Sequence, residues 1–272
     1  MAEGVRAAAT VGEAARYGSL LLAHALRRPR EWIVAHPEER LSEEQRAMFA
    51  GLCERRGAGE PIAYILGNAG FYGREFFVNG DVLIPRPETE HLVDEAIAFV
   101  KRRRGAVSVL DVGAGSGAIA CSIAAETAAV VVGTDISETA IAVAHQNARR
   151  LNVADRCAFV HGDLAEPVHG RRFGAIVANL PYVPRGDLPA APDPLSFEPR
   201  VALDGGSDGL ATYARLVPQL PPLLESGGLL LLEAAPPTIG RLQRMLQSAF
   251  PRYAIEQKHD YAGLPRYLKA VI

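Results

Sequence analysis

From residue 87 onward, short apolar runs alternate with stretches of helical periodicity, and this alternation restricts the fold more than any other feature of the sequence. The runs of strand length are Val107–Val112, Ala129–Thr134, Cys157–Val160, Ala175–Ala178, Leu229–Leu232, Tyr253–Gln257 and Tyr267–Ile272. Strand–helix alternation predicts a parallel sheet with helices on both faces. About ten residues join the last two runs, too few for a helical crossover, so at least one of these strands is expected to be antiparallel. The expected fold class is therefore α/β with a mixed sheet.

The first 70 residues have a different, helical character. Thr10 with Glu13, and Ser42 with Gln45, have the spacing of capping boxes at the start of a helix. Pro29 is suited to the first turn of a further short helix. Helices of this length are marginal alone in water, so we expect them to pack together as a small bundle.

A change of pattern separates these helices from the sheet domain. Asn79-Gly80 lies between two runs of aromatic and β-branched residues, and this dipeptide is the strongest short-range signal for a hairpin turn. A helix is expected to begin near Pro87. We therefore predict a helical domain over residues 1–70, a β-hairpin linker over 71–86 and the sheet-containing domain over 87–272.

Composition and charge exclude several classes of protein. Hydrophobic residues make up 49% of the chain, which excludes wholesale disorder. Lys and Arg number 29 against 31 Asp and Glu, so no direct nucleic-acid binding through bulk charge is expected. The three cysteines and seven histidines lack metal-ligand spacing, and we expect no metal site. Because the sequence has no signal-peptide pattern and no apolar run of about 18 residues, we expect a cytoplasmic protein without a membrane span.

A glycine-rich loop follows the first apolar run of the sheet domain and precedes a helical stretch. Such a loop lets backbone approach a ligand, and the next helix presents free N–H groups. Asp135, at the end of the following strand, is placed to hydrogen-bond ribose hydroxyls. Asp163, after the third strand, could accept from the exocyclic amine of an adenine, or could be a solvated loop carboxylate. The predicted loop residues are Gly113, Ala114, Gly115, Ser116 and Gly117.

The glycine loop alone leaves the ligand open. Gly113, Gly115 and Ala118 also satisfy the dinucleotide pattern G-x-G-x-x-G/A, and a simple turn between strand and helix would look the same. The loop favours a nucleotide-type cofactor, either a nicotinamide dinucleotide or S-adenosylmethionine, and does not choose between them.

The tetrapeptide Asn179-Leu180-Pro181-Tyr182, after the fourth strand, favours methyl transfer to an amide-like nitrogen. Such a nitrogen is a poor nucleophile, so a site must hold its NH2 group with two acceptors and direct it at the methyl group. The side-chain oxygen of Asn179 and the backbone oxygen of Leu180 offer these acceptors, and Pro181 favours an extended Leu180. Tyr182 offers an aromatic face to the planar amide and the cationic sulfonium. The chemistry would be positioning rather than general base catalysis.

With these motifs, the chain resembles the HemK/PrmC family, the peptide chain release factor glutamine methyltransferases. The resemblance runs almost end to end and is most specific over Ile84–Glu90. Its other matching segments are Glu60–Ile65, Asp111–Ala120, Glu198–Arg200 and Ala202–Leu210.

The resemblance implies a Rossmann-like, class I S-adenosylmethionine-dependent methyltransferase fold with a seven-stranded mixed sheet and a helical substrate-docking domain. It implies methylation of the glutamine in the Gly-Gly-Gln motif of release factors, which supports translation termination, with S-adenosyl-L-homocysteine as product. The protein is expected to act as a monomer with release factors as partners. Cofactor contacts would fall on Gly113–Gly117, Asp135, Asp163 and Asn179, acceptor contacts on Asn179, Leu180, Pro181 and Tyr182, and the catalytic role on Asn179, Pro181 and Tyr182.

The chain departs from the family pattern in three places, one of them Asp163, where some relatives carry an aromatic residue and the adenine contact would differ in kind. The family usually reads Asn-Pro-Pro-Tyr, and here Leu180 replaces the first proline while keeping its backbone carbonyl. The segment Glu233–Thr238 replaces the family's Glu-Ile-Gly, which we interpret as variation in a loop that enters a helix.

Three other functions are compatible with parts of this pattern. A DNA adenine amino-methyltransferase uses similar tetrapeptides, but the chain is acidic overall and lacks an evident target-recognition domain. A catalytically silent S-adenosylmethionine-binding protein would account for Leu180. A nicotinamide dehydrogenase would leave the tetrapeptide unexplained.

Overall fold

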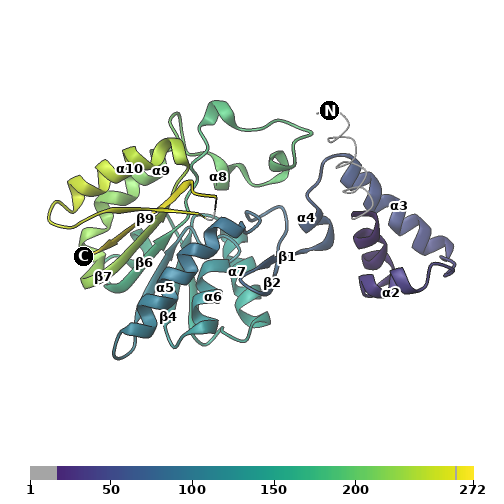
Figure 1. Cartoon of the computed structure of the whole chain (residues 1–272), viewed down its shortest axis with the longest axis horizontal. Coiled ribbons are helices and arrows are strands. Elements are labelled where there is room, and N and C mark those ends of the chain that lie inside the picture. Colours follow the sequence, from purple (N-terminus) through teal and green to yellow (C-terminus); the bar gives the residue numbers. More distant parts are fainter. Residues whose placement is uncertain (1–16, 261) are drawn as a thin grey trace. The chain divides into compact units, whose positions relative to one another are not determined.

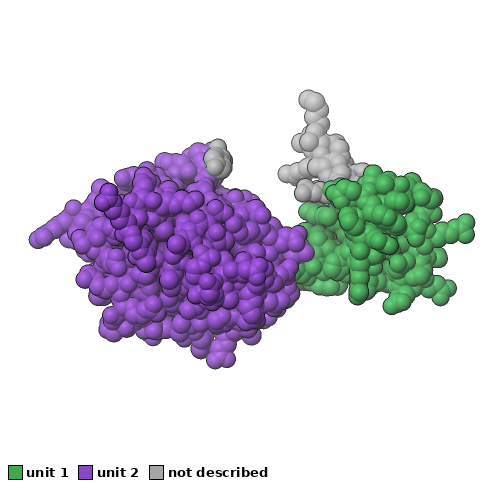
Figure 2. Space-filling model, turned by 90° about the horizontal axis from the view of Figure 1, so that it is seen from below, with its two compact units in different colours: residues 1–67, 190–197 green, residues 68–189, 198–272 purple. Residues whose placement is uncertain are grey.

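The computed structural model describes residues 17–260 and 262–272, which fall into two compact units. The first unit comprises the chain up to Gly67 together with Ala190–Phe197, and the second comprises Asn68–Pro189 together with Glu198–Ile272 (Figure 2). The segment 190–197 therefore belongs with the N-terminal helices, although it is distant from them in sequence.

The first unit is helical, as the sequence predicted. Residues 17–26 form a helix, and Leu21 and Leu52 pack with Ile65 in its small core. Ser42 caps the longest helix, because its Oγ accepts from Gln45 N at 3.1 Å while Gln45 Oε1 accepts from Ser42 N at 2.9 Å. The capping box predicted at Thr10 and Glu13 lies outside the described residues. The other helices are α2 (Arg30–Ala35), α3 (Glu43–Gly57) and α4 (Ile62–Leu66).

The β-hairpin is present, but its predicted turn was wrong. Strands β1 (Asn68–Phe71) and β2 (Arg74–Phe77) pair antiparallel, so the turn lies at Tyr72-Gly73 rather than at Asn79-Gly80. Both turn residues have positive φ, 48° and 68°, the backbone conformation that a two-residue type I′ turn requires. Phe71 and Phe76 are buried in the core of the second unit, which fixes the hairpin to that unit.

The second unit is built on the expected seven-stranded mixed sheet, with strand order β5-β4-β3-β6-β7-β9-β8 (Figure 1). Strand β9 runs antiparallel to both of its neighbours, β7 and β8, which confirms that at least one of the last two strands breaks the parallel pattern. The last two strands begin at residues 256 and 265 rather than at 253 and 267. The strands are β3 (Ser108–Val112), β4 (Val130–Asp135), β5 (Cys157–His161), β6 (Phe173–Ala178), β7 (Leu224–Glu233), β8 (Glu256–His259) and β9 (Pro265–Val271).

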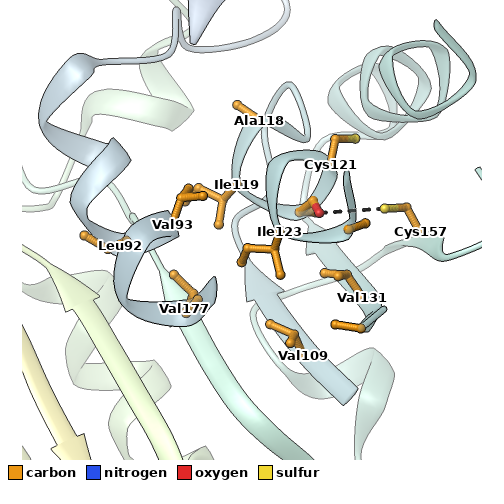
Figure 3. Packing of buried hydrophobic residues seen from close by; sticks show 14 of the residues in the cluster. Leu92, Val93, Val109, Ala118, Ile119, Cys121, Ile123, Val131, Cys157 and Val177 are labelled. Carbon is orange, nitrogen blue, oxygen red and sulfur yellow. Dashed lines mark hydrogen bonds between the residues drawn. The ribbon is translucent and has the colours of Figure 1, made fainter. Parts of the chain in front are cut away.

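Helices cover both faces of this sheet (Figure 1). On one face, Val93 of α5 and Ile119 of α6 pack over strand residues such as Val109 (Figure 3). On the other, Leu242 of α10 packs with Leu110, the next residue along β3. Alternate residues of one strand therefore enter opposite cores, as two covered faces require. The α-helices are α5 (Glu90–Arg102), α6 (Ala118–Glu126), α7 (Glu138–Arg150), α8 (Arg200–Leu203), α9 (Ala211–Leu216) and α10 (Pro236–Ala249), and short 3-10 helices span Pro87–Thr89, Glu166–Val168, Arg185–Asp187, Pro194–Phe197, Val217–Gln219 and Pro221–Leu223.

The strand order places the site. The chain adds β4 and β5 on one side of β3 and then crosses to add β6 on the other side. In a doubly wound sheet, ligands bind outside the carboxyl ends of the strands at such a reversal. The segments that follow β3 and β6 are the glycine loop and the tetrapeptide, so topology brings the two sequence motifs together.

Candidate functional site

A cavity of about 490 Å³ opens at the carboxyl ends of β3, β4 and β6. Its size is within the usual range for a small-molecule site. It is lined by most of the residues that the sequence singled out, but not by Gly117 or Tyr182. The predicted residues that line it are Gly113, Ala114, Gly115, Ser116, Asp135, Asp163, Asn179, Leu180 and Pro181.

The glycine loop needs its glycines for conformation and for space. Gly113, Gly115 and Gly117 all have positive φ, between 53° and 77°. A Cβ on Gly113 would lie 2.7 Å from Leu180 Cδ2, and one on Gly117 would lie 3.1 Å from Ala144 Cβ. A Cβ on Gly115 would meet nothing within 4 Å, since this residue faces the cavity. Gly117 therefore serves helix packing, while Gly115 leaves room for a ligand beside the backbone.

Asp135 ties the loop to the next strand and keeps acceptor capacity for a ligand. Its Oδ2 accepts from Gly115 N at 2.8 Å, and its Oδ1 accepts from Ser137 N at 2.9 Å. A carboxylate has about four acceptor positions, so about two remain for the hydroxyls of a ribose. Burial raises the pKa of Asp135, and the backbone N–H groups of Ser137 and Gly115 oppose that rise.

Asp111, which precedes the glycine loop, is fully buried and does not line the cavity. Its Oδ2 accepts from Ala120 N at 3.1 Å, and its Oδ1 has no hydrogen-bond partner among the described residues. Burial raises the pKa of this carboxyl to about 7. Asp111 therefore links β3 to the first turn of α6 and has a structural role rather than a direct role in the cavity.

Asp163 reaches the cavity, but it already has a protein partner. Its Oδ2 pairs with the guanidinium of Arg215 from α9, which also lines the cavity. The adenine contact predicted for Asp163 would have to coexist with this ion pair. Sequence reasoning did not identify Arg215, because this residue lies in α9, 52 positions after Asp163, and no sequence spacing indicates the contact between them.

Asn179 is held by a buried polar chain that the sequence analysis missed. Asn179 Nδ2 donates to Thr89 Oγ1 at 3.0 Å, and Thr89 Oγ1 donates to Glu233 Oε2 at 2.8 Å. Thr89 is 4% exposed and Glu233 is fully buried at the end of β7. An acid directly after the apolar run Leu229–Leu232 was the signal that could have revealed it.

Leu180 is fixed at its backbone as well as its side chain. Its N–H donates to Tyr213 Oη at 3.3 Å, and its side chain is 4% exposed. The hydroxyl of Tyr213 in turn donates to the backbone oxygen of Glu233. The extra N–H that leucine introduces in place of proline is therefore satisfied, and the peptide unit is held by β7.

Pro181 and Tyr182 are packed against the glycine-rich run that follows α8. Val183 N donates to Leu203 O at 3.0 Å, and Gly205 N donates to Val183 O at 2.8 Å. A Cβ on Gly205 would lie 2.9 Å from Pro181 O, so only glycine permits this close approach. The run Ala202–Leu210 thus supports the tetrapeptide. Tyr182 Oη reaches Glu233 Oε1 at 3.5 Å and lies behind the cavity wall.

A buried acid also supports the segment before α5. Glu198 Oε2 accepts from Ile84 N at 3.1 Å, and Glu198 Oε1 pairs with the guanidinium of Arg86. Arg86 and Pro85 both line the cavity. This contact joins the segments Ile84–Glu90 and Glu198–Arg200 at the cavity.

The described part of the chain contains neither a cluster of metal ligands nor a helix that could span a membrane. Among residues 17–260 and 262–272, no group of three or more His, Cys, Asp or Glu side chains is arranged to hold a metal ion. Within the same ranges, no helix is long and apolar enough to cross a membrane.

Comparison with known proteins gives matches over both units. Residues 5–67 match the model of the PrmC N-terminal domain, and residues 109–193 match that of a methyltransferase domain. A release factor glutamine methyltransferase of Bacillus cereus is 37% identical over 93% of this chain and 91% of its own length. One of Bordetella pertussis is 40% identical over 91% of each chain. One of Geobacter sulfurreducens is 42% identical over 83% of this chain and 78% of its own.

Solved structures share the fold at low sequence identity. A methyltransferase from Pyrococcus furiosus has a TM-score of 0.52 at 18% identity, over 82% of this chain and 98% of its own. A 16S rRNA methyltransferase of Thermus thermophilus, in complex with AdoMet and guanosine, has a TM-score of 0.51 at 20% identity, over 75% of this chain and 49% of its own. These similarities support the class I methyltransferase fold for the second unit.

Proposed function

This chain belongs to the family of release factor glutamine methyltransferases, and from that membership we propose that it methylates the glutamine of the Gly-Gly-Gln motif in peptide chain release factors. The methyl donor is S-adenosyl-L-methionine, and the acceptor is the side-chain amide nitrogen. The observation that carries the proposal is that Asn179, Leu180 and Pro181 line the same cavity as the glycine loop and Asp135.

The cavity fits the cofactor by the chemistry of its walls. Asp135 keeps acceptor positions for the ribose hydroxyls, and Gly115 leaves open space beside the loop backbone. Asp163 would take the adenine, and Asn179 lines the same cavity. When bound, the cofactor supplies an electrophilic methyl group.

The tetrapeptide holds the acceptor amide. Asn179 Oδ1 and Leu180 O accept the two hydrogens of the substrate NH2, which directs the nitrogen toward the methyl group. Pro181 and the buried side chain of Leu180 keep these acceptors in place. The residues do this by orienting the amide and excluding water. As the nitrogen–methyl bond forms, the methyl–sulfur bond would break to leave S-adenosyl-L-homocysteine, and one amide proton would be lost to solvent after the transfer, so no general base is required. Tyr182 does not line the cavity, and its hydroxyl contacts Glu233, the acid that holds Asn179 through Thr89.

We also propose roles for the two units, an assembly state and a cellular location. The first unit would be the substrate-docking domain, the hairpin its connection to the methyltransferase domain, and the protein a cytoplasmic monomer that does not bind nucleic acid directly. Support comes from the division of the chain at Gly67 and Asn68, and from a cavity lined entirely by residues of the second unit.

The direct test uses labelled S-adenosylmethionine with purified release factors, followed by location of the label by peptide mass. We expect label on the glutamine of the Gly-Gly-Gln motif, and none on a factor in which that glutamine is replaced by asparagine. The Asn179→Ala protein should bind the cofactor but transfer little methyl. Label on duplex DNA, with none on any release factor, would overturn the proposal in favour of an adenine methyltransferase.

A further inference from the structure

The polar chain from Asn179 to Glu233 has a direction that its chemistry imposes. An ionised carboxylate only accepts hydrogen bonds, whereas a threonine hydroxyl donates once and can also accept. With Thr89 Oγ1 at 2.8 Å from Glu233 Oε2, the single hydroxyl proton is committed to the carboxylate. Thr89 Oγ1 can then only accept from Asn179, whose amide must turn its Nδ2 toward it at 3.0 Å.

This direction decides which end of the Asn179 amide remains for a ligand. With Nδ2 used by Thr89, the carbonyl oxygen Oδ1 is the end left to accept from a group in the cavity. A substrate amide brings its NH2 group, a donor, so the site needs an acceptor at this position. The opposite orientation would set two NH2 groups against each other and leave both unpaired.

We propose that Thr89 and Glu233 are positioning residues, which fix the side-chain amide of Asn179 with its oxygen toward the methyl-accepting nitrogen. The inference rests on the proposed function, since it names residues that serve the same acceptor site. Neither residue needs to touch the cofactor or the substrate, because both act through Asn179. The proposal also gives a purpose to the acid that begins the divergent segment Glu233–Thr238.

The surroundings of Glu233 make this orientation sensitive to protonation. Tyr182 Oη faces Glu233 Oε1, the charge of Arg266 favours ionisation, and the charge of Glu88 opposes it. The hydroxyl of Tyr213 is also nearby and is bound to the backbone oxygen of Glu233. Burial dominates and raises the pKa of Glu233 to about 7. Once protonated, Glu233 could donate to Thr89, which would allow Thr89 to donate to Asn179 Oδ1 and reverse the amide.

The first test removes the hydroxyl while keeping the shape. Thr89→Val should lower kcat for release factor methylation by up to about 100-fold, the scale for a misoriented reacting group. The dissociation constant of S-adenosylmethionine, measured by calorimetry, should stay within about twofold of wild type, because valine keeps the shape of the cavity wall that Thr89 helps to form. Thr89→Ser, which keeps the hydroxyl, should restore most of kcat.

A matched control separates this effect from the loss of any buried hydroxyl. Ser122 is fully buried in α6, and its Oγ has no hydrogen-bond partner among the described residues. Ser122→Ala should therefore leave kcat unchanged. If Thr89→Val and Ser122→Ala both keep wild-type kcat, the positioning role of Thr89 is wrong.

The second test uses pH. The wild-type kcat should fall as the pH drops below about 7, because protonation of Glu233 removes the acceptor that orders the chain. The side-chain amide of the Glu233→Gln variant can both donate and accept but cannot ionise. This variant should therefore have a low kcat that does not fall further below about pH 7. Asp111 also has a pKa raised to about 7, so the Gln variant is needed to assign the step.

The outcomes distinguish this inference from the proposed function. Wild-type protein that transfers no methyl group to any release factor would overturn both. Active wild-type protein whose Glu233→Gln variant keeps the same kcat and the same pH step would overturn the positioning role alone.

Discussion

At the scale of single residues, Asp135 shows how one side chain can serve both the fold and a ligand. It accepts from Gly115 N and Ser137 N, and we place the ribose on its remaining acceptor positions. Asp135→Ala should weaken S-adenosylmethionine binding by about 1–3 kcal/mol, the scale for losing hydrogen bonds to a charged group. Calorimetry on the folded variant measures this, and an unchanged affinity would remove Asp135 from the cofactor site.

Asp111 allows a prediction about stability and pH. Its folded pKa, raised to about 7 by burial, lies above the unfolded value of about 4. Between these values the folded state binds more protons than the unfolded state, so this group lowers the free energy of unfolding as the pH rises. Asp111→Asn removes this pH-dependent loss, and the stability of the variant relative to wild type should increase by about 3 kcal/mol from pH 5 to pH 8.

Urea unfolding of both proteins at the two pH values tests this prediction. Asp187→Asn is the matched control for the chemical change, because Asp187 is exposed. A constant difference between Asp111→Asn and wild type would show that the buried acid does not titrate in this range.

Sequence reasoning could bring together the candidate site residues that follow strands, but it could not foresee contacts between residues far apart in the chain. Gly113 and Asn179 each follow an apolar run, and the parallel topology brings them to one edge of the sheet. Thr89 meets Asn179 through a contact between residues 90 positions apart, and Glu233 is 144 positions from Thr89. No spacing in the chain records such contacts, because packing of α5 against the sheet creates them.

At the scale of elements, the hairpin shows why local turn signals can mislead. Asn79-Gly80 predicted the turn, yet Asn79 instead accepts from Asp81 N through its side chain at 3.1 Å. The strands meet at Tyr72-Gly73, where burial of Phe71 and Phe76 sets the register. A tyrosine with positive φ was not predictable from turn preferences, since packing overrides the local cost.

The glycine loop and the tetrapeptide are coupled at Gly113, and this coupling can be tested. Gly113→Ala places a methyl group 2.7 Å from Leu180 Cδ2 at a φ of 76°, and Leu180 is too buried to move outward. The strained backbone should lower the free energy of unfolding by about 1–3 kcal/mol. The kcat for methyl transfer should also fall, because the new methyl group displaces Leu180. Denaturant unfolding and kcat measure the two effects.

Gly170 supplies the control for the backbone cost alone. It has a φ of 81°, is exposed, and a Cβ there would meet nothing within 4 Å. Gly170→Ala should therefore lose similar stability without losing activity. If Gly113→Ala keeps full methyl transfer, the loop does not control the position of Leu180.

At the scale of the whole molecule, the cavity belongs to one unit, and each unit has its own hydrophobic core. Every residue that lines the cavity belongs to the second unit, which has its own cores on both faces of the sheet. The first unit has a separate small core and exposes apolar side chains, with Val34 at 72% and Met48 at 46%. This division suits a catalytic unit joined to a unit that recognises a protein substrate.

Deleting residues 1–67 tests that division, and the cut leaves β1 intact because the strand begins at Asn68. Affinity for S-adenosylmethionine should stay near wild type, since the cavity is retained. Methylation of an intact release factor should fall sharply, because the exposed surface of the first unit is lost. A short Gly-Gly-Gln peptide, too small to use that surface, should lose much less. Equal losses on peptide and protein would make the first unit a folding support, and unchanged rates on both would remove it from substrate recognition.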